Sequence, residues 1–85
     1  MLTFPDFQAT GRDVPDLSEI PEIAAQGIEN TTPGRVYTDG LLYIERSADP
    51  LDPWHRLTIG NHQFVEPLAA LEQRLYEFAV SEGYI

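Results

Sequence analysis

Cysteine and lysine are both absent from this chain of 85 residues. Without cysteine, the chain can form neither a disulfide scaffold nor a thiolate metal site. Without lysine, its five basic residues are all arginine, and they face 14 acidic residues for a formal net charge of −9. Contacts to a phosphate backbone or to an anionic membrane surface need clustered basic side chains. The charge balance therefore disfavours nucleic acid and membrane as direct partners.

Long apolar runs are absent as well. No stretch approaches the roughly 20 apolar residues of a membrane span, and residues 1–6 lack the basic start and apolar stretch of a secretory signal. We therefore expect a cytoplasmic protein. An apolar content of 42% is ordinary for a globular chain, and a chain of this length builds one core. The sequence thus predicts a single domain over residues 1–85.

Two segments in the middle of the chain have the pattern of tight β-hairpins. Residues 35–44 are divided by Asp39-Gly40, and residues 56–65 are divided by Gly60-Asn61. Glycine, asparagine and aspartate tolerate the positive φ angles that two-residue hairpin turns require. Together the hairpins predict four antiparallel strands over residues 35–65.

The first predicted hairpin is apolar on both faces, because Tyr37 faces Leu42 across the strands and Val36 faces Tyr43. Such a hairpin is either covered on both sides or leaves one face exposed for a partner. One face carries Arg35, Tyr37, Leu42, Ile44 and Arg46, and the other carries Val36, Thr38, Leu41, Tyr43 and Glu45.

The second predicted hairpin has one apolar and one more polar face, so its core side is easier to assign. Extending its register places His55 opposite Glu66. We expect the core face to carry Leu57, Ile59, His62 and Phe64, and the other face to carry Arg56, Thr58, Gln63 and Val65.

Residues 66–82 predict an amphipathic helix that covers one face of the sheet. Pro67 suits the first helical position, and Gly83 suits the position that follows the last turn. The apolar stripe repeats every three or four residues and consists of Leu68, Leu71, Leu75, Phe78 and Ala79.

The N-terminal third is less regular. Residues 18–29 predict a short helix with Ser18 as its N-cap, Pro21 in its first turn and Gly27 near its end. We expect residues 1–17 to be an irregular segment that docks on the core, because Pro5, Gly11 and Pro15 interrupt regular structure there. The predicted fold is therefore α+β: an antiparallel four-stranded meander with a C-terminal helix on one face and a short N-terminal helix.

No motif for catalysis, metal or cofactor binding occurs in the sequence. His55 and His62 are the only histidines, and they fall near opposite ends of the second hairpin, too far apart to share one metal ion. Nothing nearby supplies a nucleophile. Asp39, Asp49 and Asp52 fit turns better than a calcium loop, because prolines alternate with these acids. We therefore predict no enzymatic activity, no metal, no cofactor and no small-molecule ligand.

By elimination, the sequence favours a small acidic interaction module, such as an adaptor, regulator or assembly subunit. Its partner would be another protein, of basic character, or a second copy of the chain. The alternative is an acidic mimic of nucleic acid that inhibits a nucleic-acid-binding protein. A small enzyme built around His55 or His62 is a third, weaker hypothesis. The candidate partner-binding residues combine aromatic, aliphatic and arginine side chains, which are enriched at interfaces: Tyr37, Leu42, Tyr43, Ile44, Arg46 and Trp54.

Overall fold

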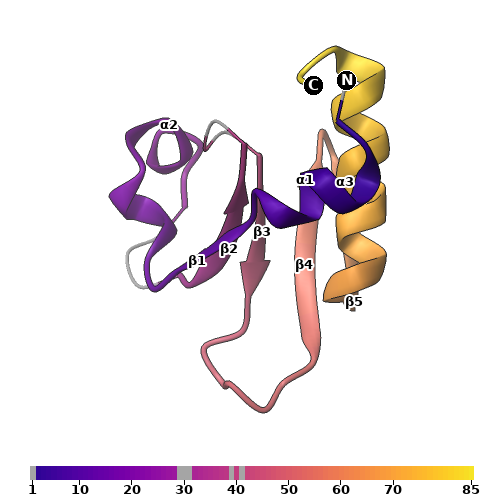
Figure 1. Cartoon of the computed structure of the whole chain (residues 1–85). Coiled ribbons are helices and arrows are strands. Elements are labelled where there is room, and N and C mark those ends of the chain that lie inside the picture. Colours follow the sequence, from indigo (N-terminus) through magenta and orange to yellow (C-terminus); the bar gives the residue numbers. More distant parts are fainter. Residues whose placement is uncertain (1, 29–31, 39, 41) are drawn as a thin grey trace.

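The computed structural model describes residues 2–28, 32–38, 40 and 42–85, and it has an α+β fold (Figure 1). An antiparallel sheet of five strands has the spatial order β1-β2-β3-β4-β5. No helix among these residues is both long and apolar enough to cross a membrane. The elements are α1 (Phe4–Ala9), β1 (Arg12–Val14), η1 (Leu17–Glu19, a 3₁₀ turn), α2 (Pro21–Ala24), β2 (Gly34–Tyr37), β3 (Leu42–Arg46), β4 (Trp54–Ile59), β5 (His62–Pro67) and α3 (Leu68–Glu82).

The four predicted strands are five in the structure, because residues 12–14 add β1 to the outer side of β2. Arg12 pairs with Val36, and Val14 pairs with Gly34. A strand of three residues is too short to produce a readable alternation, so its conformation follows from the neighbour with which it pairs. The first 17 residues are therefore more regular than the sequence indicates.

The expectation that Pro5 interrupts any helix was wrong, because Pro5 lies in the first turn of α1. A proline at this position removes no helical hydrogen bond, because the first N–H groups of a helix have no acceptor within the helix. Thr3 caps the helix by accepting a hydrogen bond from the backbone N–H of Asp6 at 3.3 Å. α1 ends at Ala9, and β1 begins at Arg12.

Residues 17–24 form two short elements where the sequence predicts one helix over residues 18–29. Ile20 separates them with extended backbone angles, φ −98° and ψ 109°. The next residue is Pro21, whose ring disfavours the helical conformation in the residue before it. Pro21 does open α2 as expected, but Ser18 is not the cap: Asp16 accepts the backbone N–H of Ser18 at 2.9 Å.

Both hairpins have the predicted register. Tyr37 pairs with Leu42 in the first, and His55 pairs with Glu66 in the second. The Gly60-Asn61 turn is confirmed, with φ +59° at Gly60. Asp39 and Leu41, which belong to the predicted first turn and its flank, lie outside the described residues.

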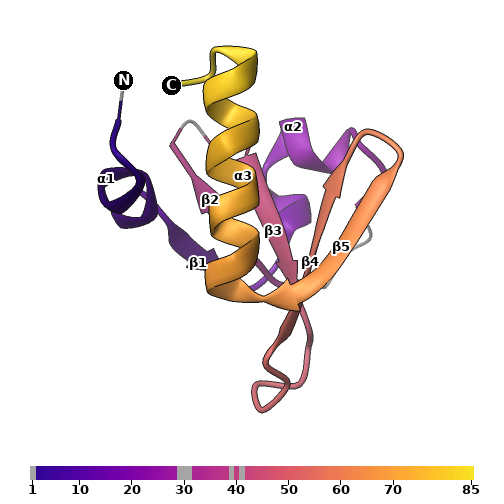
Figure 2. The ribbon, with the colours of Figure 1, turned by 90° about the vertical axis from the view of Figure 1, so that its right-hand side faces the viewer.

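Side chains cover both faces of the first hairpin. On one face, Tyr37, Leu42 and Ile44 join a buried cluster with Phe7 of α1 and with α3. On the other, Val36 and Tyr43 pack with residues of β1, η1 and α2 in a smaller cluster. Figure 2 shows α3 in front of the sheet and α2 behind it. Within this hairpin, the segments before residue 28 thus close the face that α3 leaves open.

The sheet is split between β3 and β4. Their ladder contains the pairs Glu45–Arg56 and Arg46–His55 and stops there, and the two strands diverge towards the hairpin turns (Figure 2). A hollow of about 240 Å³ occupies the space between them, with Leu42 on one side and Ile59 on the other. The domain therefore consists of a β1–β3 part and a β4–β5 part with few backbone bonds between them.

We expect Gly34→Ala to lower the free energy of unfolding by about 2 kcal/mol, as overpacking of a filled core does. A Cβ atom added at Gly34 would lie 2.6 Å from Cδ1 of Leu17 and 2.7 Å from the backbone oxygen of Ile44. The backbone oxygen cannot move without disturbing the β2–β3 ladder. Urea unfolding followed by far-ultraviolet circular dichroism measures the change. Alanine is otherwise preferred to glycine inside a strand, so an unchanged or raised stability would contradict the tight contact.

Candidate interaction surface

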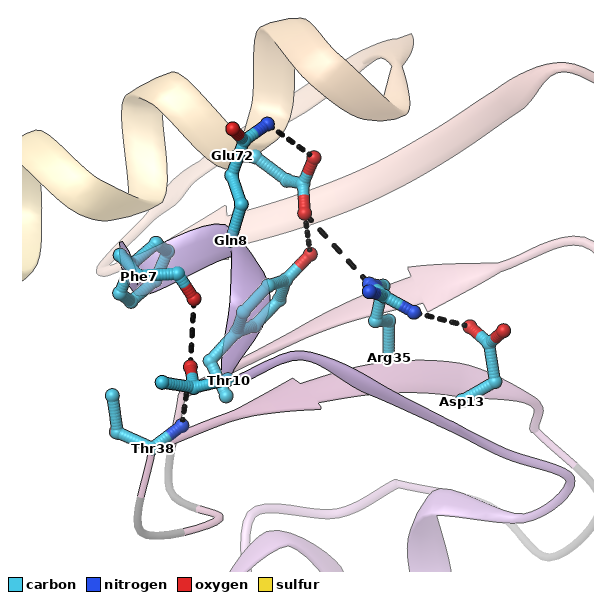
Figure 3. A network of polar contacts seen from close by, with 8 residues as sticks. Phe7, Gln8, Thr10, Asp13, Arg35, Thr38 and Glu72 are labelled. Atoms are coloured by element: carbon cyan, nitrogen blue, oxygen red, sulfur yellow. Dashed lines mark hydrogen bonds and ion pairs between the residues drawn. The ribbon is translucent and has the colours of Figure 1, made fainter. Parts of the chain in front are cut away.

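The most buried charged side chain in the described part of the chain is Glu72 of α3, which is 5% exposed. The hydroxyl of Tyr37 donates to Oε2 of Glu72 at 2.6 Å, and the side-chain amide of Gln8 donates to Oε1 at 3.2 Å. Nε of Arg35 lies 3.7 Å from Oε2, and Arg35 also pairs with Asp13 at 3.3 Å. Figure 3 shows Gln8 of α1 and Arg35 of β2 directed at the Glu72 carboxylate of α3, with Asp13 of β1 on the other side of Arg35.

This buried network has a structural role. Burial raises the pKa of the Tyr37 hydroxyl, and the hydrogen bond to Glu72 and its negative charge raise that pKa further. The hydroxyl therefore stays protonated and continues to donate to Glu72. Since Tyr37 is 1% exposed, a substrate cannot reach this hydroxyl. The network fixes α1 and α3 to the sheet, and the two groups at its centre, the Tyr37 hydroxyl and the Glu72 carboxylate, are both buried.

The histidines are separated in the way that the sequence predicts. His55 pairs with Glu66 in the ladder, and its Nδ1 lies 3.1 Å from the carbonyl oxygen of Pro53. His62 lies next to the turn at the other end of β5 and is exposed. Across residues 2–28, 32–38, 40 and 42–85, no group of three side chains is placed to hold a metal ion.

An exposed apolar surface lies on β4 and β5, on the side opposite α3. The smaller buried cluster covers that side only as far as β3, since none of its members comes from β4 or β5. Trp54 is 51% exposed and Val65 is 59% exposed, although both belong to regular strands. We call this surface the open face; by strand alternation it consists of Trp54, Arg56, Thr58, Gln63 and Val65.

Hydrogen bonds order the backbone of the open face, and a hollow adjoins it. Arg56 and Val65 form a ladder pair, and Nε of Arg56 donates to Glu45 of β3 at 2.6 Å. The backbone N–H of Trp54 donates to Asp52 at 2.9 Å, which fixes the start of β4. A hollow of about 300 Å³ adjoins these residues, and Trp54, Arg56 and Val65 contribute to its wall.

Three residues of the predicted partner-binding set are not on the surface. Tyr37, Leu42 and Ile44 are 1%, 5% and 0% exposed. Their burial follows from the position of α3, whose apolar stripe covers this face of the first hairpin. These three residues therefore cannot contact a partner of the folded domain.

The other three residues of that set lie in different environments. Tyr43 is half-buried against the smaller cluster, and its hydroxyl donates to Gln26 at 3.2 Å. Arg46 pairs with His55 on the α3 side of the sheet, and its Nε is buried without a hydrogen-bond partner among the described residues. Of the predicted residues, Trp54 alone belongs to the open face, and Arg46 contributes to the wall of the hollow that adjoins it.

Two residues with a clear role were not selected from the sequence. Val65 is apolar on the face of the second hairpin that is otherwise polar, and this mismatch was a readable signal of an exposed apolar surface. Glu72 follows Leu68 by four residues and precedes Leu75 by three. A carboxylate on the apolar stripe of a helix needs partners, and here Tyr37 and Gln8 supply them.

Comparisons with known proteins add no further assignment. No protein-family model, curated protein or solved structure significantly matches this chain.

Proposed function

We propose that this domain is a non-enzymatic interaction module that binds another protein through its open face. The exposure of Trp54 and Val65 on adjacent regular strands carries the proposal. Removing large apolar side chains from water stabilises a complex by about 25 cal/mol per Å² of apolar surface. Tryptophan and arginine are also enriched among the residues that dominate binding energy, and Arg56 adjoins Val65 in the ladder.

The fixed backbone of the open face supports the same proposal. A surface that is already ordered loses little conformational entropy when it binds. Here the ladder holds Val65 and Arg56, and Asp52 holds the backbone of Trp54. The partner would therefore meet a preformed surface, with the hollow beside Trp54 as a receptor for one of its side chains.

The acidic side chains favour this function over mimicry of nucleic acid. Mimicry needs a row of unpaired carboxylates on one surface. In the described residues, many of the acids instead serve the fold itself. Asp13, Glu45 and Glu66 pair with arginines; Asp16, Asp49 and Asp52 accept backbone N–H groups; and Glu72 is buried.

The test compares the capture of protein partners by two variants in native lysate. Trp54→Ser removes the aromatic side chain from the open face. Tyr84→Ser removes an aromatic side chain of similar exposure, 48% against 51%, which follows the end of α3 and is not part of the open face. We expect Trp54→Ser to reduce the capture of an enriched partner at least tenfold, which corresponds to about 1.4 kcal/mol, and Tyr84→Ser to leave it unchanged.

Circular dichroism of both variants must first show that they are folded. Equal capture by the wild-type chain and Trp54→Ser would contradict the assignment to the open face. Absence of any enriched partner would contradict the interaction module altogether, provided that light scattering also shows a monomer.

A further inference from the structure

β5 is an exposed edge of the sheet. It is the last strand in the spatial order β1-β2-β3-β4-β5 and runs from His62 to Pro67, whereas β1, at the other edge, spans only Arg12–Val14. Short edge strands are poor templates for pairing, and long ones are good templates. β5 is thus the one of the two edges that can receive another strand along its length.

The outward backbone groups of β5 belong to Gln63 and Val65. The two-residue turn makes Ile59 and His62 the first hydrogen-bonded pair of the hairpin. Because N–H and C=O groups alternate in direction along a strand, those of Gln63 and Val65 point away from β4. Outside the ladder, neither residue takes part in a backbone hydrogen bond with another described residue.

The usual devices that protect an edge are weak on β5. Lysine, the residue that most often blocks such pairing, is absent from the chain. Pro67 lacks an N–H group, but it stands at the last position of the strand. Val65 is 59% exposed and adds an apolar side chain to the edge.

We propose that β5 pairs antiparallel with β5 of a second copy of the chain, about a two-fold axis at Phe64. In this register Gln63 lies opposite Val65 of the second copy, and each of the two equivalent pairs exchanges two backbone hydrogen bonds. At the axis, Phe64 of one copy lies opposite Phe64 of the second copy. The proposal goes beyond the function above, because it uses the edge of the sheet and not the open face.

A polar side-chain pair across the axis favours a second copy as the occupant, and it adds to the pairing of Glu66 with Arg74 inside each copy. The same register brings His62 opposite Glu66 of the second copy, and an imidazole N–H is a donor for a carboxylate. An axis at Val65 would instead place Gln63 opposite Pro67, which has no N–H to donate. The axis at Phe64 therefore uses both outward-facing residues and keeps Pro67 out of the bonding.

Pairing in this way would join the two open faces side by side in one continuous sheet. Val65 of one copy would lie next to Gln63 of the other, with Trp54 one strand further on each side. The net charge of −9 on each copy opposes the association. We therefore expect a weak dimer, with a dissociation constant on the order of 100 µM.

The proposal is tested by the oligomeric state of the full chain and of two matched lysine variants. Val65→Lys places a lysine on the edge strand, whereas Thr58→Lys places one on the same face but on β4, which is internal. Sedimentation equilibrium between about 10 µM and about 1 mM spans the expected transition. We expect the wild-type chain and Thr58→Lys to dimerise alike, and Val65→Lys to dimerise at least tenfold more weakly.

Gln63→Pro gives a second, independent test, because it removes an N–H group that faces outward and bonds to nothing within β4. A folded monomer is the expected result. A wild-type chain that stays monomeric at about 1 mM, or a dimer insensitive to Val65→Lys and Gln63→Pro, would overturn the proposal. A different protein bound along β5 in place of a second copy would also overturn it. None of these outcomes measures the capture of a partner through Trp54, so the open-face proposal keeps its own test, the comparison of Trp54→Ser with Tyr84→Ser.

Discussion

Replacing Phe7 by alanine is expected to lower the free energy of unfolding by about 4 kcal/mol. The Phe7 side chain is fully buried, and its ring stacks on Tyr37 with centroids 4.9 Å apart and planes inclined by 9°. It also contacts Tyr76 of α3, with centroids 5.6 Å apart. A domain of this size has a total stability of about 4–13 kcal/mol, so the substitution removes between about a third and all of it.

Phe4→Ala is the matched control, because Phe4 belongs to the same helix but is only half-buried, with its ring 5.5 Å from Tyr76. Its loss should cost about 1–2 kcal/mol, in proportion to the smaller apolar area that it buries. Urea unfolding followed by far-ultraviolet circular dichroism compares the two. Equal losses for both variants, or a loss below about 1 kcal/mol for Phe7→Ala, would show that α1 is not part of the core.

Glu72→Ala is expected to destabilise the domain by about 3 kcal/mol, because it leaves a cavity and removes the acceptor of a buried hydroxyl. The hydroxyl of Tyr37 has no other acceptor within hydrogen-bond distance among the described residues. Glu77→Ala on the same helix is the control, since Glu77 is exposed and, among the described residues, accepts a hydrogen bond only from Gln73. It should change the stability by less than about 0.5 kcal/mol.

A double-mutant cycle separates the hydrogen bond from the cavity. Tyr37→Phe removes the donor, so Glu72→Ala in that background should cost about 1–2 kcal/mol less than in the wild-type chain. Thermal and urea unfolding of the four proteins supply the cycle. If the losses of unfolding free energy caused by Tyr37→Phe and Glu72→Ala simply add in the double variant, then the hydrogen bond between Tyr37 and Glu72 does not couple α3 to β2. The buried carboxylate would then have another role.

Local sequence signals predicted the hairpins and the final helix well, because each depends on neighbours a few residues apart. The Gly60-Asn61 turn fixes a register that aligns His55 with Glu66. The stripe from Leu68 to Ala79 identifies the face of α3 that packs on the sheet. For such elements, turn chemistry and periodicity determine the structure.

The N-terminal third depended on distant residues and was predicted less well. β1 exists because Arg12 and Val14 pair with residues of β2 that are 24 and 20 positions away in the chain. Neither residue carries that information in its own neighbourhood. The break at Ile20 is different: Pro21 signalled it through a steric rule that acts on the preceding residue.

The candidate site was predicted only in part for the same reason. The sequence showed that the first hairpin is apolar on both faces, but it did not show what covers each face. Tertiary packing decided that Tyr37 and Ile44 are core residues, and it left Trp54 and Val65 exposed. A residue's chemistry marks it as suitable for an interface, whereas the arrangement of the other elements determines whether it is accessible.

The short ladder between β3 and β4 divides the sheet into two sub-sheets, β1–β3 and β4–β5. Backbone hydrogen bonds hold each sub-sheet together, but the ladder between the two contains only the pairs Glu45–Arg56 and Arg46–His55 among the described residues. Beyond these pairs, the two sub-sheets are joined by side-chain packing in the buried cluster that contains Ile44, Leu57 and Leu71. Side-chain packing tolerates small rotations that a ladder of directional bonds does not. We therefore expect the packing of α3 to set the angle between the two sub-sheets. That angle in turn sets the curvature of the sheet face opposite α3.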